Sequence, residues 1–258
     1  MLKSLLIFSV IFSSSLNAKS ISHSNYDLIA QKIYQNECAA NPQNLLFWNE
    51  KEPFPSLGIA HFIWFPKGVT PAFEQVFPEF LAFVQRKAPQ IPIPVSNFSN
   101  APWQNREVFY ALKELGALQQ WQAFFESTFS LQAEFIVYRF QSKLTTMIAQ
   151  VPDHDKQEVL AKLNALMQFE KGQYLLIDYT NFKGIGINPK ETYQGQGWGL
   201  LQVLQTMEMP SQLTTKAILD NFIRAAKQTL KQRTELSANP ELEATWLEGW
   251  FKRLDSYR

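Results

Sequence analysis

The chain has one cysteine, Cys38, so it cannot form a disulfide within itself. Histidine is also scarce, with three residues, and neither His23 nor His154 stands at a metal-ligand spacing from His61. We therefore expect neither a metal site nor a cofactor. Stability must come from a buried core, and 46% hydrophobic residues with 21 phenylalanines supply the material for it.

An excess of charge of either sign is lacking as well. Lys and Arg total 24, and Asp and Glu total 23. Residues 1–18 contain Lys3 and no acid, so a chain without them has 23 of each and a net charge of zero. Nucleic acids and anionic membrane surfaces attract proteins mainly through surplus Lys and Arg, so neither is an expected partner.

The longest apolar run lies at the start of the chain. Lys3 precedes Leu5 to Phe12, and three serines then lead to Leu16-Asn17-Ala18, which fits the charged, apolar and small-residue regions of a signal peptide. The run is shorter than the roughly 20 residues of a membrane-spanning helix. We expect cleavage after Ala18, leaving residues 19–258 as one domain without a membrane anchor, in the periplasm or secreted.

Most of the remaining chain shows helical periodicity of its apolar residues. The apolar run Leu57 to Phe65, set among prolines, instead predicts a strand or a small hairpin. The expected fold class is therefore mainly α (α+β), with one small β-hairpin and many helices. The proline-rich stretch 88–104 is the best candidate for a boundary between lobes. Helices are expected over 25–38, 73–84, most of 105–169, 174–182, 200–207, 213–236 and 242–254.

Glycine is rare but clustered, since five of the ten glycines fall at positions 184, 186, 195, 197 and 199. Such a cluster predicts a loop whose backbone needs positive φ or lies close to another group. Gln194, Gln196 and Trp198 occur in the same segment, so it suits the lining of a site for an extended polar ligand.

Three segments stand out from the helical background: Glu37 at the end of the first expected helix, Gly58-Ile59-Ala60-His61, and Asn181-Phe182-Lys183-Gly184-Ile185-Gly186. Together they resemble the lysozyme-like superfamily, particularly phage-type lysozymes. There, a helix ending in the catalytic Glu leads into a Gly-Ile-Gly-His hairpin, and a later helix carries a Phe-Asn-x-Gly-x-Gly-like turn. Alanine replaces the second glycine here, and the resemblance covers about a third of the chain.

A second likeness involves Gly199-Leu200-Leu201-Gln202 and Glu37-Cys38, which are similar to the Gly-Leu-Met-Gln and Glu-Ser signatures of lytic transglycosylases. The two resemblances imply a lysozyme-like helical domain that cleaves the glycan strands of peptidoglycan outside the cytoplasm. Either hydrolysis, as in a muramidase, or lytic transglycosylation would fit.

Glycosidic cleavage needs a carboxylic acid placed against the leaving oxygen. Glu37 takes this role by resemblance. At a helix end, among apolar groups such as Tyr34, Ile59 or Trp64, its charged form would be disfavoured, so that it stays protonated near neutral pH. His61 is expected to support Glu37 from beneath the hairpin.

A second carboxylate would serve as base or nucleophile, and the candidates are Glu50, Glu52 and, less favoured, Glu191. Ser56 could instead hold a water molecule. If no carboxylate stands opposite Glu37, the lytic transglycosylase mechanism is preferable, in which one Glu acts first as acid and then as base.

Sugar binding is expected to use aromatic rings, which stack on the apolar faces of sugars. Seven residues are the candidates for contact with the glycan: Trp48, Trp64, Asn181, Tyr193, Gln196, Trp198 and Gln202.

Two other hypotheses about the function remain. The absence of an evident second carboxylate favours a non-catalytic glycan-binding or envelope-interaction protein on the same scaffold. A cysteine hydrolase built on Cys38 and His61 is less favoured, because no orienting acid is evident and a helix C-terminus raises the pKa of a thiol.

Overall fold

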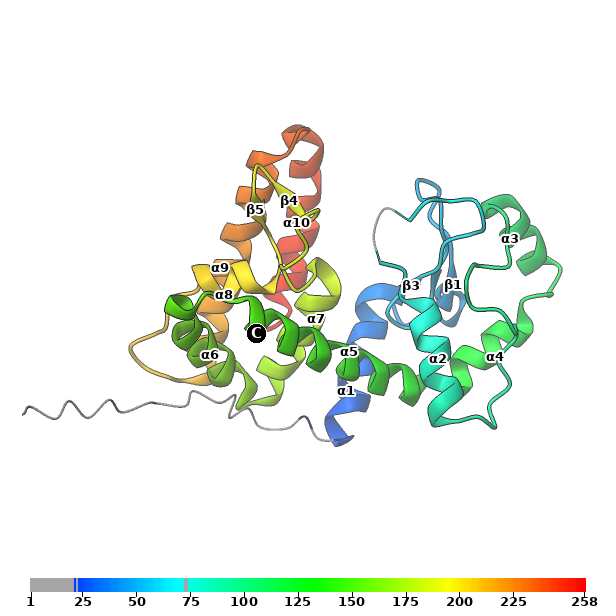
Figure 1. Ribbon diagram of the computed structural model, residues 1–258, viewed down its shortest axis with the longest axis horizontal. Helices are drawn as coiled ribbons and strands as arrows, with labels where there is room; N and C mark the ends of the chain where they lie inside the picture. Colours follow the sequence, from blue (N-terminus) through cyan, green and yellow to red (C-terminus); the bar gives the residue numbers. More distant parts are fainter. Residues whose placement is uncertain (1–20, 22, 72–73) are drawn as a thin grey trace, which may run out of the picture.

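The computed structural model describes residue 21, residues 23–71 and residues 74–258, so the signal peptide predicted at 1–18 lies outside the described residues. The expected fold class, mainly α with a small β-hairpin, is confirmed (Figure 1). The helices are α1 (His23–Cys38), α2 (Phe77–Lys87), α3 (Arg106–Glu114), α4 (Gln119–Ser127), α5 (Phe129–Gln150), α6 (Asp153–Met167), α7 (Glu170–Lys183), α8 (Leu200–Thr206), α9 (Thr215–Leu236) and α10 (Pro240–Asp255). A short 3-10 helix, η1, covers Pro42–Leu45.

A small antiparallel sheet follows η1, formed by β1 (Leu46–Phe47), β2 (Ser56–Leu57) and β3 (Phe62–Ile63) in the order β1-β2-β3. The expected hairpin is the β2–β3 pair, with Leu57 opposite Phe62. Gly58 has φ +70 after β2, a conformation that a side chain would disfavour. The sequence did not reveal β1, because a two-residue strand shows no alternation of apolar and polar residues.

The first lobe contains this sheet with α2, α3 and α4, on the right in Figure 1. Its core is aromatic. The ring of Trp64 lies 5.0 Å from that of Phe77 and 6.1 Å from that of Trp103, and Phe77 lies 5.7 Å from Phe125. Burying each such side chain contributes roughly 1.5–3 kcal/mol, so this core needs neither disulfide nor metal.

The proline-rich stretch 88–104 packs within the first lobe rather than between lobes. Trp64 donates its indole N–H to the carbonyl of Phe98 at 3.1 Å, and Ala101 donates its backbone N–H to Phe65 at 2.9 Å. The lobe boundary expected there is therefore wrong. Prolines stop helices wherever they occur, and here they shape a loop that covers the core.

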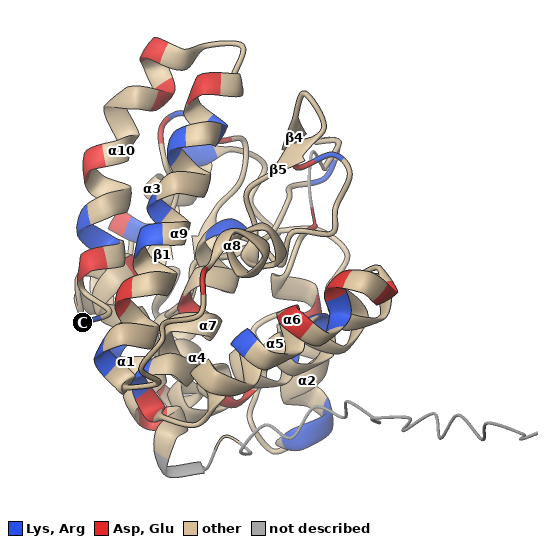
Figure 2. Ribbon diagram, turned by 90° about the vertical axis from the view of Figure 1, so that its left-hand side faces the viewer, with Lys and Arg blue, Asp and Glu red and all other residues tan. Residues whose placement is uncertain are grey.

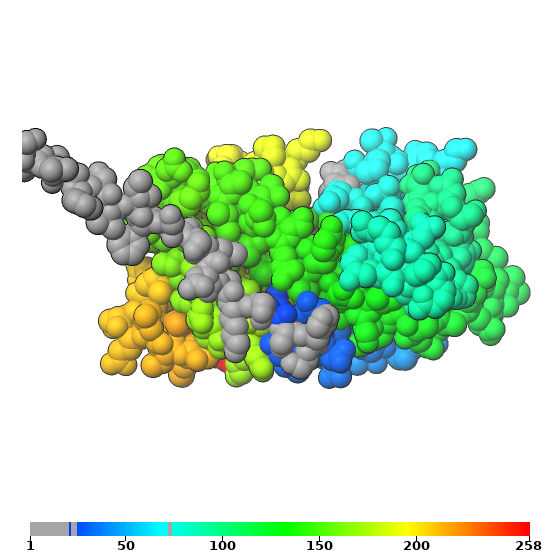
Figure 3. Space-filling view, turned by 60° about the horizontal axis from the view of Figure 1, so that its bottom comes forward, coloured from blue at the N-terminus to red at the C-terminus, as the bar shows by residue number. Residues whose placement is uncertain are grey.

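The chain crosses between the two lobes along α5, the long green helix of Figure 1. Helix α1 packs against α5, and the ring of Tyr34 meets that of Phe129 edge to face at 5.7 Å. Figure 3 shows the surfaces of α1 and α5 between the two lobes. Asn25 on α1 also donates to the side chain of Gln173 on α7 at 3.1 Å, so α1 is anchored to both halves.

The second lobe contains α6 to α10 and a two-stranded hairpin of β4 (Thr192–Tyr193) and β5 (Gln196–Gly197). This hairpin lies in the glycine-rich segment, where Gly184, Gly186 and Gly195 have positive φ as the clustering predicts. Tyr179, fully buried, donates its hydroxyl to the carbonyl of Trp198 at 2.9 Å and so attaches this segment to α7.

Charges of both signs are interspersed along α9 and α10 (Figure 2). Such a surface matches the balanced count of acidic and basic residues in the sequence. No helix in the described part of the chain combines the length and the apolar character needed to cross a bilayer.

Candidate functional site

A cleft of about 610 Å³ lies between the two lobes. The first lobe contributes the β2–β3 hairpin and the loop after β1, and the second contributes the end of α7, the glycine-rich segment and α9. Helix α5 contributes Arg139 and Lys143. The residues that line it are Glu52, Ala60, His61, Phe62, Ile63, Glu74, Val76, Arg139, Lys143, Thr180, Asn181, Phe182, Lys183, Gly184, Glu191, Trp198 and Arg233.

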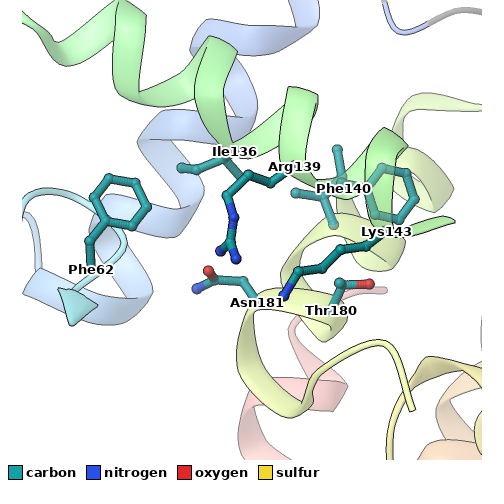
Figure 4. Close-up of a pocket in the computed structure, with 8 residues that line it drawn as sticks. Phe62, Ile136, Arg139, Phe140, Lys143, Thr180 and Asn181 are labelled. Carbon is teal, nitrogen blue, oxygen red and sulfur yellow. The ribbon is translucent and has the colours of Figure 1, made fainter. Parts of the chain in front are cut away.

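Figure 4 shows a small pocket that shares Arg139, Lys143 and Asn181 with this cleft, and in it Arg139 and Lys143 extend from α5 toward Asn181 on α7. Both cations are held by Glu74, whose Oε2 lies 2.8 Å from Arg139 Nη2 and 2.7 Å from Lys143 Nζ. The pKa of Glu74 is lowered by these two cations, although burial alone would raise it. Glu79 adds a second carboxylate 2.8 Å from Arg139 Nε, so both cations are paired within the protein.

Glu37 lies at the end of α1, beside His61, and its side chain is 19% exposed. Its Oε1 accepts a hydrogen bond from Nη2 of Arg253 at 2.7 Å. The sequence predicted apolar surroundings for Glu37, and the structure gives its carboxyl group a guanidinium partner from α10 that was not expected. Helical periodicity cannot predict this contact, because Arg253 lies 216 positions from Glu37 in the sequence.

Arg253 is shared between Glu37 and Asp178, a fully buried carboxylate on α7. Asp178 accepts from Arg253 Nε at 2.9 Å and Nη2 at 2.8 Å, and from the hydroxyl of Tyr257 at 2.5 Å. Burial alone would lower the pKa of Arg253, but Asp178 and Glu37 hold it above its ordinary value. Since Asp178 takes two of the guanidinium's bonds and Glu37 takes one, Asp178 compensates most of the charge of Arg253.

His61 positions the hairpin and faces Glu37. Its Nε2 lies 3.1 Å from the carbonyl oxygen of Asn44, so Nε2 is the donor, and its ring stacks on Phe47 with an interplanar angle of 12°. Burial lowers the pKa of His61, although Glu37 and the Asn44 carbonyl oppose this shift. A neutral ring that donates from Nε2 presents Nδ1 as an acceptor, 4.0 Å from Glu37 Oε2.

Of the candidates for the second catalytic role, Glu52 lies in the cleft and two others do not. Burial raises the pKa of Glu52, which favours its protonated form. Glu50 is exposed on the turn before it, and Ser56 is buried within β2, so neither lines the cleft. Glu191, the less favoured candidate, also lines the cleft and accepts a hydrogen bond from Asn188 at 3.1 Å.

Two of the three tryptophans expected to contact sugar are core residues instead. Trp48 is 2% exposed and Trp64 is 0% exposed, and each donates its indole N–H to a backbone carbonyl, of Glu52 and of Phe98. A residue pattern does not distinguish a buried tryptophan from one that floors a cleft. Trp198 lines the cleft, as does Asn181.

The remaining sugar-binding candidates support the glycine-rich segment. The Gln202 side chain accepts from Gly199 N at 3.0 Å and donates to the carbonyl of Gly186 at 3.0 Å, so both ends of its amide are occupied. Tyr193 packs on Trp198 at 4.6 Å and donates its hydroxyl to Glu243 at 2.6 Å. Gln196 lies on β5 outside the lining of the cleft.

The sequence did not single out the cationic and aromatic wall of the second lobe. Arg233 lies over the ring of Trp198 at 4.2 Å and over that of Trp250 at 5.1 Å, and its Nε lies 3.1 Å from Glu243 Oε2. Lys183 lies over Trp250 at 3.4 Å. These residues come from three helices and the segment after β5, so their proximity has no sequence signature. Asp178, an acid inside the apolar run 174–179, was the one visible signal of a buried charge.

Cys38 has no nucleophilic role in this geometry. It is buried, and burial, together with Glu37, raises the pKa of its thiol to about 12. A thiol with this pKa is not ionised at neutral pH. In the part of the chain that the structure describes, no group of three or more His, Cys, Asp or Glu side chains could hold a metal ion.

Comparison with protein-family models, with curated proteins and with solved structures gave no match to this chain.

Proposed function

We propose that the protein cleaves the glycan strands of peptidoglycan in the cleft between its lobes, with Glu37 as the general acid. The observation that carries this proposal is the gathering of carboxyl groups at one cleft: Glu52, Glu74 and Glu191 line it, and Glu37, outside the lining, lies 4.0 Å from His61, which lines it. Acid–base cleavage of a glycosidic bond needs such carboxyl groups beside an extended groove.

The arrangement around Glu37 suits an orienting role for Arg253. Asp178 already compensates most of the guanidinium charge, so the single bond to Glu37 fixes the direction of its carboxyl group. Nδ1 of His61 lies 4.0 Å from Oε2 of Glu37, so His61 also borders the Glu37 carboxyl group. Glu52, which lines the cleft, is the second carboxyl group of the proposed mechanism.

Digestion of purified peptidoglycan sacculi by the wild type and by Glu37→Gln tests the proposal. Glutamine keeps an acceptor for Arg253 but has no proton to transfer, so the rate should fall about 10²- to 10⁴-fold. Glu79→Gln is the matched control, because Glu79 also pairs with an arginine, Arg139 at 2.8 Å, and does not line the cleft. The control should digest sacculi at the wild-type rate.

Mass analysis of the released fragments separates the two mechanisms. Fragments with a reducing end indicate hydrolysis, and anhydro fragments indicate lytic transglycosylation, in which the sugar's own hydroxyl closes the ring. Glu52→Gln should abolish a hydrolysis that needs a second carboxyl group and should leave the lytic reaction largely intact. Equal digestion by the wild type and Glu37→Gln would remove Glu37 from the mechanism.

One observation favours a second function, a non-catalytic glycan-binding protein. The ion pair between Glu37 and Arg253 stabilises the carboxylate, which is not the form that donates a proton. If the wild type binds sacculi and releases no fragments, this second function replaces the first.

A further inference from the structure

Four cations line the cleft, and three of them have carboxylate partners. Arg139 and Lys143 pair with Glu74, and Arg233 pairs with Glu243. The fourth is Lys183, the last residue of α7. Within the described residues, its ammonium forms neither an ion pair nor a hydrogen bond, and its close neighbours are aromatic rings.

The surroundings of Lys183 are unfavourable for an isolated charge. Its Nζ lies 3.4 Å from the centre of the Trp250 ring and 4.2 Å from that of Phe182. Burial, then Arg233 on α9 and Arg253 on α10, lower its pKa to about 6, and Glu243 on α10 opposes them weakly. The rings attract the ammonium, and among the described residues no carboxylate forms an ion pair with it.

We propose that Lys183 binds a carboxylate of the glycan substrate, so that the cleft selects acidic glycan strands over neutral ones. The inference rests on the proposed function for the identity of the ligand. The hydrogen-bond donors of Lys183 are unused, and an anion bound beside Nζ favours the protonated, charged form of this side chain. Neutral sugars such as chitin strands offer no partner for it.

The position of Lys183 favours a role in ligand binding over a role in packing alone. Lys183 lies beside Asn181 and Phe182 at the end of α7, and Gly184 and Trp198 line the cleft next to it. Aromatic rings and amides are the surfaces on which sugars bind, so a charge placed among them can reach a substituent of a bound sugar. A lysine needed for packing alone could be replaced by an apolar residue without affecting the choice of ligand.

Peptidoglycan offers carboxylates from two sources. The lactyl group of muramic acid carries one when no peptide is attached, and the stem peptides carry others when they are present. If Lys183 binds the lactyl carboxylate, the preferred substrate is a peptide-free strand, and an amidase reaction that hydrolyses the lactyl–peptide bond must come first.

Binding to three glycan oligosaccharides of equal length tests the inference: a peptide-free peptidoglycan strand, the same strand with its lactyl carboxyls reduced to alcohols, and the strand with stem peptides. Calorimetry or fluorescence titration with Glu37→Gln avoids cleavage during the measurement. The Glu37→Gln protein should bind a carboxylate-bearing strand about 10- to 100-fold more tightly than the reduced strand. This is the range for one hydrogen bond to a charged group. Whether the peptide-free or the peptide-bearing strand binds more tightly identifies the source.

The double variant Glu37→Gln/Lys183→Met should lose the preference for the carboxylate-bearing strand, because methionine fills similar space against Trp250 without a charge. The double variant Glu37→Gln/Lys143→Met is the matched control, since Lys143 lines the same cleft but is already paired with Glu74, and it should keep the preference. Equal binding of all three strands, or a preference that survives Lys183→Met, would overturn the inference even if the sacculi are digested.

The affinity for the acidic strand should also depend on pH. Free Lys183 loses its proton around pH 6, and a bound carboxylate raises its pKa, so binding above that pH must take up a proton. Affinity should therefore be full below pH 6 and should fall at higher pH by up to about tenfold per unit. The charged groups that face Lys183 are Arg233 on α9 and Arg253 and Glu243 on α10. Calorimetry in two buffers of different ionisation enthalpy measures the proton uptake directly, and its absence would contradict the assignment.

Discussion

At the scale of single residues, the candidate site depends on buried charges that compensate one another. Asp178 is fully buried, in contact with Arg253 and Tyr257, and burial and then Asp178 raise the pKa of the Tyr257 hydroxyl. Asn36 joins the group by donating to Tyr174 at 2.8 Å and to Asp178 at 3.4 Å. The carboxylate that the mechanism uses, Glu37, is thus held by a residue whose own position depends on Asp178.

Asp178→Asn should destabilise the fold by about 3–5 kcal/mol, because it leaves the buried guanidinium of Arg253 short of its main partner. For a domain of this size the melting temperature falls roughly 2–4 °C per kcal/mol. Asp153→Asn is the control, since Asp153 is 98% exposed and pairs with Lys156 at the surface, and it should change stability by less than about 1 kcal/mol. Equal melting of the two variants would show that Asp178 does not stabilise this part of the fold.

Glu37 and Lys183 both lie near arginines, but the arginines stabilise the charge of one and destabilise the charge of the other. Glu37 gains a partner of opposite charge, whereas Lys183 is placed near two groups of its own sign. Neither environment follows from the neighbours of these residues in the sequence, because the arginines concerned lie on α9 and α10.

At the scale of elements, the β2–β3 hairpin is fixed by one side chain of α5. Gln132 is fully buried, and its Oε1 accepts the backbone N–H of Ile59 at 2.8 Å, while its Nε2 donates to the carbonyl of Phe125 at 2.9 Å. This pair of bonds ties the hairpin that carries His61 to the helix that joins the lobes. The cleft therefore depends on Gln132 although Gln132 does not line it.

Gln132→Ala should cost roughly 2–4 kcal/mol, since it leaves the Ile59 N–H and the Phe125 carbonyl unsatisfied. Urea unfolding measures the loss, and hydrogen exchange should show its largest increase at the Ile59 amide. Gln141→Ala on the exposed side of the same helix is the control and should change stability by less than about 0.5 kcal/mol. Faster exchange spread evenly over the chain would indicate a general loss of stability and not a loosened hairpin.

At the scale of the whole molecule, two lobes meet along α1 and α5, and the cleft takes residues from both. Glu52 and His61 come from the first lobe, and Trp198 and Arg233 from the second. A ligand in the cleft would contact residues separated by more than 130 positions in the chain. Such a site exists only when both lobes are folded and in contact.

The mature protein should begin at Lys19, because Leu16-Asn17-Ala18 ends a signal peptide pattern. Expression in a bacterium with an intact export system, followed by N-terminal sequencing of the periplasmic or secreted fraction, measures this. An Ala18→Leu variant should be processed poorly, since cleavage needs a small residue at that place. Recovery of an intact Met1 on membrane-bound material would contradict both the cleavage and the absence of an anchor.

The sequence by itself determined the helices and the hairpin. Apolar residues at helical spacing predicted α1, α2 and every helix from α7 onward to within a few residues, and the apolar run after Pro55 predicted β2 and β3. The stretch 105–169 was predicted as helical almost throughout, without the divisions between α3, α4, α5 and α6. Glycine clustering predicted the positive φ of Gly184, Gly186 and Gly195. These features are local, because each depends on residues within a few positions of one another.

The tertiary structure alone decided which side chains meet. It placed Trp48 and Trp64 in the core, moved the lobe boundary from 88–104 to α5, and gave Glu37 an arginine partner. It also brought Lys183, Arg233 and Trp250 together from three helices. The physical reason is that ionisation and burial depend on distances in space, and Glu37 and Arg253 are 216 positions apart in a chain whose pattern records only short-range periodicity.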